Sequence, residues 1–352
     1  MKTLTIFIFG LIAMTAISCT KEPAAQVDEV FAAYTGNVPG AAVMVIHNGK
    51  PVLTKTYGMA NLESQTPITP QTNFRLASVS KAFTAMCVLM LIEDDYLTYD
   101  ATLCDIFPDF PEYGKQITIR NLLQHTSGLI DYESLMPDTA TAQVHDSDAL
   151  AMMMAQDSTY FAPGSDYSYS NTGYALLAMI VEKIGAMPYP EFLKTRIFEP
   201  LGMSNTLAFV NGYNSVPNRA FGYTVHEDSI EFTDQSSTSA VLGDGGIYSS
   251  LEDMFKWDQA LLANTLVGDS TMQLAYTPNL ETYGFGWRID EVDGHRRIHH
   301  NGSTRGFRNC FQRFPDDNFA VIVLTNRNSP ESVQPLAEKV VEIYWHLLKD
   351  NG

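Results

Sequence analysis

Segments with strand character lie at both ends of this chain, and a helical stretch separates them. Near the start, the apolar, β-branched run 41–47 is followed by Asn48-Gly49 and then by a second run, 51–57. An Asn-Gly pair between two such runs predicts a β-hairpin. Short strands separated by turn residues are predicted near the other end, over 283–289, 295–300, 309–314 and 319–324. One antiparallel sheet built from both ends of the chain accounts for this order.

Helical periodicity marks the middle of the chain and its end. Apolar residues recur at helical steps over 81–93, and the patterns of 172–184 and 189–198 are also helical. An amphipathic helix is expected over 332–348. The expected fold class is therefore α+β, an α/β sandwich in which helices flank an antiparallel sheet and an all-helical insertion separates its strands.

The charge balance excludes one class of partner. The chain has 40 acidic and 22 basic residues, a net charge of −18, and no basic run. Nucleic-acid binding needs a basic surface that releases counterions from phosphates. The expected partner is therefore a small molecule or a short peptide, and not a nucleic acid.

The first residues have the pattern of an export signal. Lys2 precedes a mostly apolar stretch, 4–17, which as a helix would reach only about 21 Å. A bilayer core is about 30 Å thick, so a cleavable signal peptide over 1–18 fits better than a membrane span.

The end of this stretch suggests lipid attachment. Ala16-Ile17-Ser18-Cys19 resembles the lipobox of bacterial lipoproteins, although such boxes most often have Leu where this chain has Ala16. Cys19 would then carry a lipid, 19–27 would be a tether, and the lipid would be the membrane contact. This predicts an exported bacterial protein that is periplasmic or associated with the outer membrane. The alternative is ordinary signal cleavage, with Cys19 a bystander.

The remaining cysteines suggest neither disulfides nor metal. Cys87, Cys104 and Cys310 are odd in number and irregular in spacing, which does not make a disulfide framework. No paired Cys or His spacing typical of zinc occurs, so no metal and no cofactor are expected.

Three short motifs carry the candidate chemistry, and the first is Ser78-Val79-Ser80-Lys81 at the start of the helix predicted over 81–93. Residues three apart on a helix share a face, so the lysine amine comes close to the serine hydroxyl. A serine hydroxyl becomes nucleophilic when a neighbour takes its proton, and a lysine with a lowered pKa can do so. Taken alone, the motif is better explained by a capping serine and a surface lysine.

The second and third motifs lie far along the chain. Tyr169-Ser170-Asn171 occupies a loop before a helix, where Tyr169 could relay a proton and the Asn171 amide could bind both a substrate carbonyl and the lysine. His300-Asn301-Gly302, followed by Ser303, ends a predicted strand. There the imidazole offers a donor beside a reacting carbonyl, and the glycine lets backbone approach a ligand closely. Each motif alone is explained by a loop or turn.

In this order, the three motifs resemble those of class C β-lactamases and their relatives, the DD-peptidases, D-aminopeptidases and a group of esterases. Other short segments also resemble sequences of this family, including Leu122–Leu129, Pro200–Met203 and Tyr283–Trp287. The resemblance implies a β-lactamase/transpeptidase-like catalytic domain over 28–350. Its α/β part would comprise about 28–75 and 240–350, and its helical part about 76–239.

The resemblance also implies roles for the site residues. Ser78 attacks a carbonyl and forms an acyl-enzyme, while Lys81 and Tyr169 share proton transfer. Asn171, His300, Gly302 and Ser303 bind the substrate, with the backbone N–H groups of Ser78 and Ser303 as the oxyanion hole. The implied enzyme is a serine hydrolase without cofactor.

One departure from the family's pattern affects the substrate. In β-lactamases proper the third motif usually begins with Lys, and here His300 takes that place. A permanent cation favours a β-lactam carboxylate more than a neutral imidazole does. This favours D-amino-acid-containing peptides, as for a DD-carboxypeptidase, or small esters. A true class C-type β-lactamase and a non-catalytic penicillin-binding-like protein are the alternatives.

Other polar residues near the motifs are interpreted more simply. Arg305 and Arg308 are equally well explained as carboxylate-binding residues and as surface arginines. His125 and the turn 126–128 are interpreted as structural, because they lie outside the three motifs.

Overall fold

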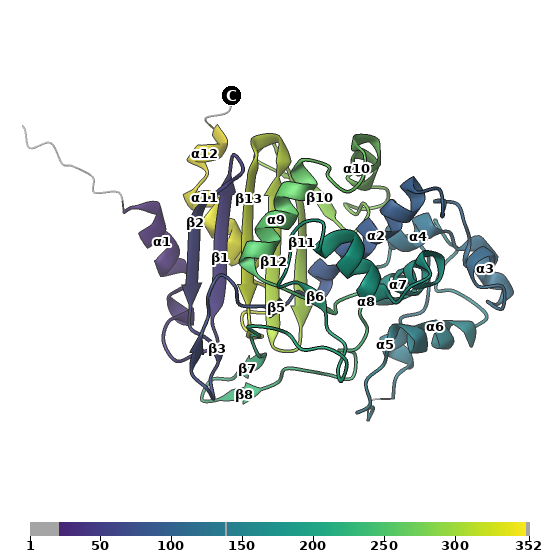
Figure 1. Ribbon diagram of the computed structural model, residues 1–352, viewed down its shortest axis with the longest axis horizontal. Helices are drawn as coiled ribbons and strands as arrows, with labels where there is room; N and C mark the ends of the chain where they lie inside the picture. The colour runs from purple at the N-terminus through teal and green to yellow at the C-terminus, as the bar shows by residue number, and fades with distance from the viewer. Residues whose placement is uncertain (1–20, 138, 350–352) are drawn as a thin grey trace, which may run out of the picture.

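A computed structural model describes residues 21–137 and 139–349 of the chain. Six strands form one antiparallel sheet in the order β10-β11-β12-β13-β1-β2, which confirms that both ends of the chain build it (Figure 1). Their bounds are β1 Ala41–His47, β2 Lys50–Tyr57, β10 Arg288–Val292, β11 His295–Thr304, β12 Phe307–Phe314 and β13 Phe319–Thr325. Asn48 and Gly49 both have positive φ, as the predicted hairpin turn requires.

The strand predicted over 283–289 is wrong in its position. β10 begins only at Arg288, and the preceding residues turn against helix α2 (Lys81–Glu93). Gly286 has a φ of +78°, and a Cβ there would lie 2.9 Å from the Lys81 carbonyl oxygen. Three aromatic side chains of this segment are buried: Tyr283, Phe285 and Trp287. Their alternation therefore reflects packing within a turn and not pairing in a sheet.

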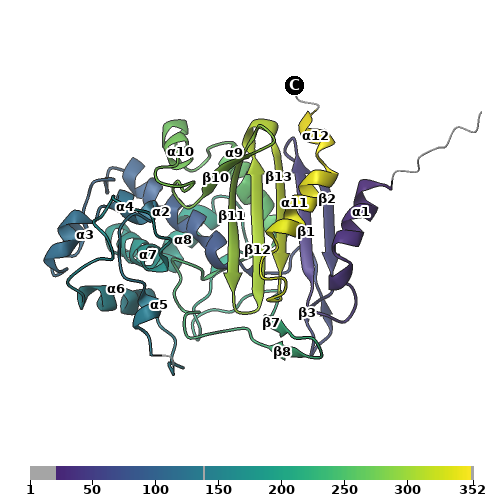
Figure 2. The same ribbon diagram turned by 180° about the vertical axis from the view of Figure 1, so that it is seen from behind.

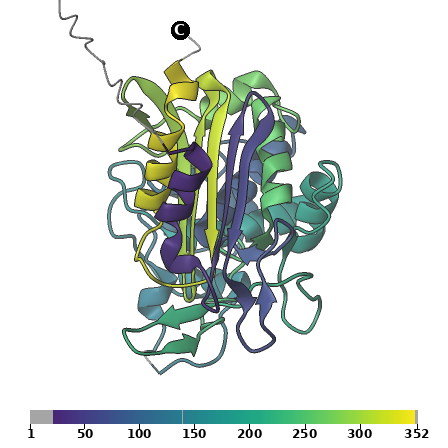
Figure 3. The same cartoon turned by 90° about the vertical axis from the view of Figure 1, so that its left-hand side faces the viewer.

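Helices cover both faces of the sheet (Figures 2 and 3). Helices α1 (Pro23–Val30) and α11 (Gln334–Ile343) lie side by side on one face, and α9 (Leu251–Leu262) packs on the other. Along β1, Val43 and Val45 join the core under α1 and α11, whereas Met44 and Ile46 join the larger core that includes α2 and α9. This period of two is what a strand covered on both faces requires.

Helix α1 corrects the tether predicted over 19–27. Residues from Pro23 onward are helical, and Val27 is fully buried in the core beneath α11. Burial of this apolar side chain fixes the segment against the domain. The predicted signal peptide 1–18 and lipid-attachment residue Cys19 lie outside the described residues.

The helix predicted over 332–348 is two helices. α11 ends at Ile343, and α12 (His346–Lys349) follows after Tyr344 and Trp345. The Trp345 ring packs edge-on against His295 and Phe314, which explains why the chain turns there and does not continue as one helix.

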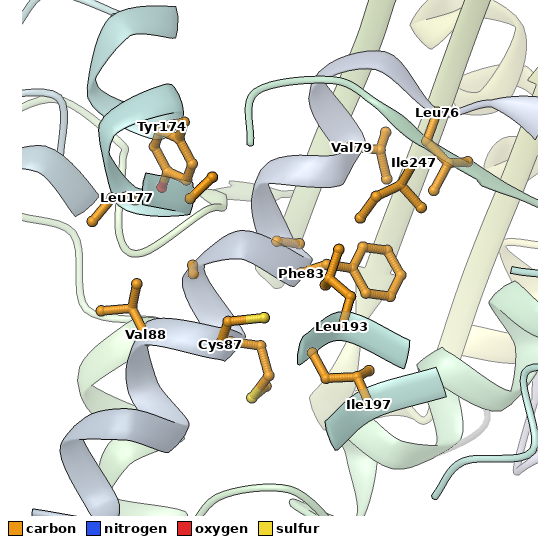
Figure 4. Close-up of a cluster of buried hydrophobic side chains, with 14 of the residues drawn as sticks. Leu76, Val79, Phe83, Cys87, Val88, Tyr174, Leu177, Leu193, Ile197 and Ile247 are labelled. Atoms are coloured by element: carbon orange, nitrogen blue, oxygen red, sulfur yellow. The ribbon is translucent and has the colours of Figure 1, made fainter. Parts of the chain in front are cut away.

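The helical part is organised around α2 and α7 (Asn171–Gly185). All side chains of α2 from Lys81 to Leu91 are buried, so this helix is enclosed on all sides and is not amphipathic. Figure 4 shows Phe83 and Val88 of this helix together with apolar side chains that surround it, among them Val79, Tyr174, Leu177, Leu193 and Ile197. Phe83 also stacks on Trp257 of α9, with 4.2 Å between ring centroids. Helix α2 therefore joins the helical part to the sheet.

The other helices are short: α3 Leu103–Ile106, α4 Ile119–Leu123, α5 Tyr132–Leu135, α6 Asp146–Met154, α8 Tyr189–Leu193 and α10 Asp269–Ala275. The helix predicted over 189–198 is α8 extended by a π-helical turn, Lys194–Phe198. Small strands also occur, three of them within the part expected to be all-helical: β3 Met59–Asn61, β4 Thr66–Pro67, β5 Phe74–Arg75, β6 Leu207–Ala208, β7 Tyr223–Val225, β8 Ile230–Phe232 and β9 Ile247–Ser249.

The three cysteines of the described residues form no disulfide. Cys87, Cys104 and Cys310 are free thiols, and burial raises the pKa of Cys310 to about 12. Within 21–137 and 139–349, no group of three or more His, Cys, Asp or Glu side chains is placed to hold a metal ion. None of the helices in these two ranges has the length and apolar character needed to cross a bilayer.

Candidate active site

Ser78 lies in a tight turn that precedes α2. The turn is a 3₁₀ segment, Ala77–Ser80, and it begins at a residue with a φ of +50°, a conformation that costs energy for alanine. β11 passes directly behind it, because a Cβ on Gly302 would lie 2.1 Å from the Leu76 carbonyl oxygen. This backbone contact requires glycine at position 302, whereas the approach of a ligand expected there stays a prediction.

Lys81 is the first residue of α2, and its side chain is fully buried. Its Nζ donates to Ser78 Oγ at 3.2 Å, to Asn171 Oδ1 at 2.9 Å and to the Asp244 carbonyl oxygen at 2.9 Å. These acceptors match the three hydrogens of an ammonium group and fix the amine beside the serine hydroxyl. The alternative of a surface lysine is therefore excluded.

The second motif borders the same amine. Lys81 Nζ lies 5.0 Å from the centre of the Tyr169 ring, which is half-buried. The capping role belongs to Ser170, whose Oγ accepts from the Gly173 N–H at 3.0 Å and begins α7. This cap places Asn171 at the first position of α7, where its side chain reaches Lys81.

Asn171 binds a second partner that the sequence did not suggest. Its Nδ2 donates to Glu133 Oε1 at 2.9 Å, so Oδ1 and Nδ2 face a lysine and a carboxylate respectively. Glu133 lies in α5, within a segment whose sequence has no motif that would identify it. The structure therefore adds Glu133 to the site.

His300 does not present a free donor to a substrate, which corrects the role expected for it. The ring is buried, its Nδ1 donates to the Asn301 carbonyl oxygen at 2.7 Å, and its Nε2 accepts from the Tyr283 hydroxyl at 3.0 Å. Burial, reinforced by the positive charge of Lys81, holds the pKa of His300 well below its usual range. The imidazole is thus neutral, and both nitrogens are occupied.

The third motif instead supplies a strand beside the nucleophile. β10 pairs with β11 only as far as His299, and within the described residues no named strand pairs with the outer side of 300–304. Ser303 is exposed on this segment and lines a small pocket together with Ser78, Asn171 and Glu133. The predicted site residues Ser78, Asn171 and Ser303 therefore share one cavity.

A largely buried aspartate, Asp244, also lines this pocket. The Tyr132 hydroxyl donates to Asp244 Oδ2 at 3.1 Å, and the Asp244 carbonyl oxygen accepts from Lys81. Burial raises the pKa of Asp244 to about 6, although the positive charges of Lys81 and Arg75 oppose this rise. Together with Glu133, Asp244 makes the surroundings of the lysine acidic.

The arginine that approaches the motifs is not one of the two expected. Arg308 is bound to the Glu331 and Phe307 carbonyl oxygens at 2.8 Å each, so it is a structural residue, and Arg305 is exposed. Arg288, the first residue of β10, lies over the rings of Tyr169 and Tyr283, 5.8 and 5.7 Å from their centroids. Arg288 therefore supplies a guanidinium beside the tyrosines of the site.

Comparisons with known proteins agree with the family resemblance of the three motifs. The family model described as Beta-lactamase matches residues 27–344. The chain is 32% identical over 322 residues to Penicillin-binding protein 4* of Bacillus subtilis (strain 168), covering 85% of this chain and 71% of that protein. It is 28% identical to Protein flp of Staphylococcus aureus (strain MRSA252), covering 87% of this chain but 64% of that protein, less than two thirds of its length.

A solved structure gives the same fold. The D-amino acid amidase from Ochrobactrum anthropi SV3, complexed with L-phenylalanine amide, matches with a TM-score of 0.77 at 24% identity, covering 94% of this chain and 98% of that one. The antiparallel sheet with flanking helices is thus the β-lactamase/transpeptidase-like fold that the sequence predicted. Because the family model spans nearly all of the described residues, the chain belongs to the beta-lactamase family and is a serine hydrolase.

Proposed function

We propose that this enzyme hydrolyses short peptides that contain D-amino acids, through an acyl-enzyme on Ser78. The contact that carries the proposal is the one between Lys81 Nζ and Ser78 Oγ, at 3.2 Å, in a site where Asn171 also holds the lysine. A buried amine held beside a hydroxyl is the arrangement that activates a serine nucleophile. The similar proteins include a penicillin-binding protein and a D-amino acid amidase, which supports this substrate class.

In the proposed reaction, the ammonium group of Lys81 first gives up one proton to solvent. Ser78 Oγ then attacks the scissile carbonyl carbon while its own proton passes to the Lys81 amine, with Tyr169 sharing the transfer. The backbone N–H groups of Ser78 and Ser303 hold the oxyanion, and one such donor is worth about 2.7–4 kcal/mol in hydrolases. The C–N bond then breaks, and the leaving amine takes up the proton. Water attacks the resulting ester, releases the acid and restores Ser78.

Two charged side chains suit a short zwitterionic peptide. The Glu133 carboxylate lines the pocket and binds Asn171, so it offers a place for a substrate ammonium group. Arg288, stacked on Tyr169 and Tyr283, offers a guanidinium for a substrate carboxylate. Small esters share the same chemistry with a better leaving group, and they are the second candidate substrates.

A substrate panel tests the proposal. Purified protein lacking residues 1–19 is assayed with D-Ala-D-Ala peptides, with their L-Ala-L-Ala counterparts and with p-nitrophenyl esters, each beside Ser78→Ala. We expect turnover of the D-peptides, and a drop in kcat/KM of about tenfold or more in Arg288→Met, since a charge-assisted hydrogen bond contributes about 1.5–3 kcal/mol. Turnover of L-peptides and D-peptides at equal rates would refute the substrate class.

Efficient β-lactam hydrolysis is disfavoured by His300. Its ring is neutral and both nitrogens are bound within the protein, so it cannot attract a β-lactam carboxylate as a lysine would. We expect penicillin to acylate Ser78 slowly and nitrocefin to be turned over no faster than by Ser78→Ala. Rapid, saturable nitrocefin hydrolysis that requires Ser78 would instead make the protein a β-lactamase.

We also propose that the protein is exported and lipidated on Cys19. The support is the pattern of the first residues, Lys2, the apolar stretch 4–17 and the lipobox-like Ala16-Ile17-Ser18-Cys19. Intact mass of the full-length protein expressed in a bacterium tests this. A mature chain that begins at a lipid-modified Cys19, absent in Cys19→Ser, is the expected result, and cleavage elsewhere without lipid would contradict it.

A further inference from the structure

His125 lies directly behind the second motif but does not line the pocket. It follows α4, has a φ of +58°, and its side chain is completely buried. Its imidazole is packed among tyrosine rings, with centroid distances of 4.3 Å to Tyr169, 5.1 Å to Tyr174, 4.3 Å to Tyr283 and 6.1 Å to Tyr167. A residue in this position can affect the reaction only through the groups that it holds.

The backbone on both sides of Tyr169 is bound by this one histidine. The His125 carbonyl oxygen accepts from the Ser168 N–H at 3.0 Å, and His125 Nδ1 accepts from the Ser170 N–H at 3.0 Å. The two bonds bracket Tyr169, whose ring lies over the Lys81 amine at 5.0 Å. Loss of either hydrogen bond would therefore let Tyr169 move relative to the Lys81 amine.

His125 keeps its hydrogen on Nε2, which indicates that Nδ1 must remain an acceptor for the Ser170 N–H. Because Nδ1 accepts, the hydrogen is on Nε2, and this buried atom has no hydrogen-bond partner in the part of the chain that the structure describes. An apolar side chain would fill the same space without leaving a polar atom unsatisfied. Burial, reinforced by the positive charges of Lys81 and Arg288, holds the pKa of His125 well below its usual range, which keeps Nδ1 free to accept.

We propose that His125 is a positioning residue that fixes Tyr169 over Lys81 by binding the peptide groups on both sides of it. This rests on the proposed function only in that Tyr169 then takes part in proton transfer. A displacement of about 1 Å at a reacting group can cost about 100-fold in rate. We call the two hydrogen bonds from the Ser168 and Ser170 N–H groups to His125 the clamp. If the clamp holds Tyr169 in place, a substitution of His125 will strongly slow acylation even though His125 lies outside the pocket.

Two substitutions at the same position separate the clamp from simple packing. His125→Asn keeps an acceptor at nearly the place of Nδ1, and asparagine tolerates positive φ. His125→Gly also tolerates positive φ but has no acceptor. We expect the acylation rate of the Asn variant by a fluorophosphonate to stay within about threefold of wild type and that of the Gly variant to fall at least about tenfold, the loss expected from weakened positioning.

A double-mutant cycle with Tyr169→Phe assigns this loss to the tyrosine. If His125 acts by placing the Tyr169 hydroxyl, the Gly substitution changes the acylation rate less than twofold in the Tyr169→Phe background, because coupled residues are not additive. An equal loss in both backgrounds would overturn the proposal, as would a Gly variant that acylates like wild type. Loss of rate in the Asn and Gly variants alike would also overturn it. If the Gly variant does not fold, His125→Ala replaces it, because alanine has no acceptor and already occupies positive φ in this chain at Ala77 and Ala186.

Hydrogen exchange tests the clamp without any activity. Peptides that contain the Ser168 and Ser170 amides should exchange faster in His125→Gly and at the wild-type rate in His125→Asn. Unchanged exchange in the Gly variant would refute the clamp. If the wild type itself is not acylated at Ser78, the proposed function fails, and the exchange result alone decides whether His125 holds the loop.

Discussion

At the scale of single residues, the site depends on how closely two backbone segments approach each other. Gly302 of β11 passes the Leu76 carbonyl oxygen at a distance that leaves no room for a Cβ. Ala77, the residue between Leu76 and Ser78, already has a φ of +50°, so the turn has little freedom to move away. The position of Ser78 is therefore fixed from behind by a glycine on another strand.

We predict that Gly302→Ala disables the site. The new methyl group would push β11 away from the turn, and a shift of about 1 Å costs about 100-fold in the acylation rate. Acylation kinetics with a fluorophosphonate measure this. Gly268→Ala is the control, because its nearest neighbour is the movable Glu93 carboxylate at 3.3 Å. Acylation of Gly302→Ala at the wild-type rate would show that the close approach is unimportant.

The site could be predicted from the sequence only where its residues belong to a motif. Ser78 and Lys81 are three residues apart, so helical geometry alone brings them together. Glu133 reaches the site from the short helix α5 and Arg288 from the start of β10, and nothing in their neighbouring residues marks them. The role of His300 was misjudged because its partner, Tyr283, comes from a turn that the sequence presented as a strand.

At the scale of elements, helix α2 connects the two parts of the fold. It carries Lys81 at its first position, and Phe83, two residues further on, packs against Trp257 and Phe198, with ring centroids 4.2 and 5.8 Å away. A helix buried on all sides is held by packing and not by an exposed polar face. Its stability therefore depends on large side chains such as Phe83.

We predict that Phe83→Ala lowers the free energy of unfolding by about 3–5 kcal/mol, the usual cost of emptying such a buried aromatic site. Urea unfolding measures it. The control is Tyr96→Ala, whose side chain is 68% exposed and whose loss should change stability by less than about 0.5 kcal/mol. Equal small effects for the two variants would contradict the central position of α2.

Helix α6 supports the site through a buried carboxyl group. Asp146 accepts from the Leu242 and Gly243 N–H groups at 2.8 and 2.9 Å, immediately before Asp244, whose carbonyl oxygen binds Lys81. Burial raises the pKa of Asp146 to about 7, although these two hydrogen bonds lower it. Protonation of the Asp146 carboxyl is therefore linked to the segment 242–244, whose last residue accepts a hydrogen bond from Lys81.

The sign of the resulting pH dependence follows from this raised pKa. The folded state binds the Asp146 proton more tightly than the unfolded state, so this stabilisation is complete below the ordinary carboxyl pKa of about 4 and is lost as pH rises through about 7. We predict that the unfolding free energy of Asp146→Asn changes less between pH 5 and 7 than that of wild type. Urea unfolding at several pH values measures it, with the exposed Asp109→Asn as control. Identical slopes would contradict the prediction.

At the scale of the whole molecule, the fold was more predictable than the site. Alternating apolar runs and the Asn48-Gly49 turn define the sheet locally, and the separation of strands to both ends of the chain indicates one sheet with an insertion. The hydrophobic pattern gave wrong predictions in two segments, the strand over 283–289 and the single helix over 332–348. In both segments, aromatic side chains pack across the expected element, and a local pattern does not contain such long-range contacts.

The central claim is that Ser78 forms the acyl-enzyme, and intact-mass analysis after incubation with a fluorophosphonate or a penicillin tests it most directly. Wild-type protein should gain the mass of one probe, and peptide mapping should place it on Ser78. Ser78→Ala should gain none, and Lys81→Met should react about 10²–10⁴-fold more slowly, the usual contribution of a general base. No adduct on wild type, or an equal adduct on Ser78→Ala, would contradict the account.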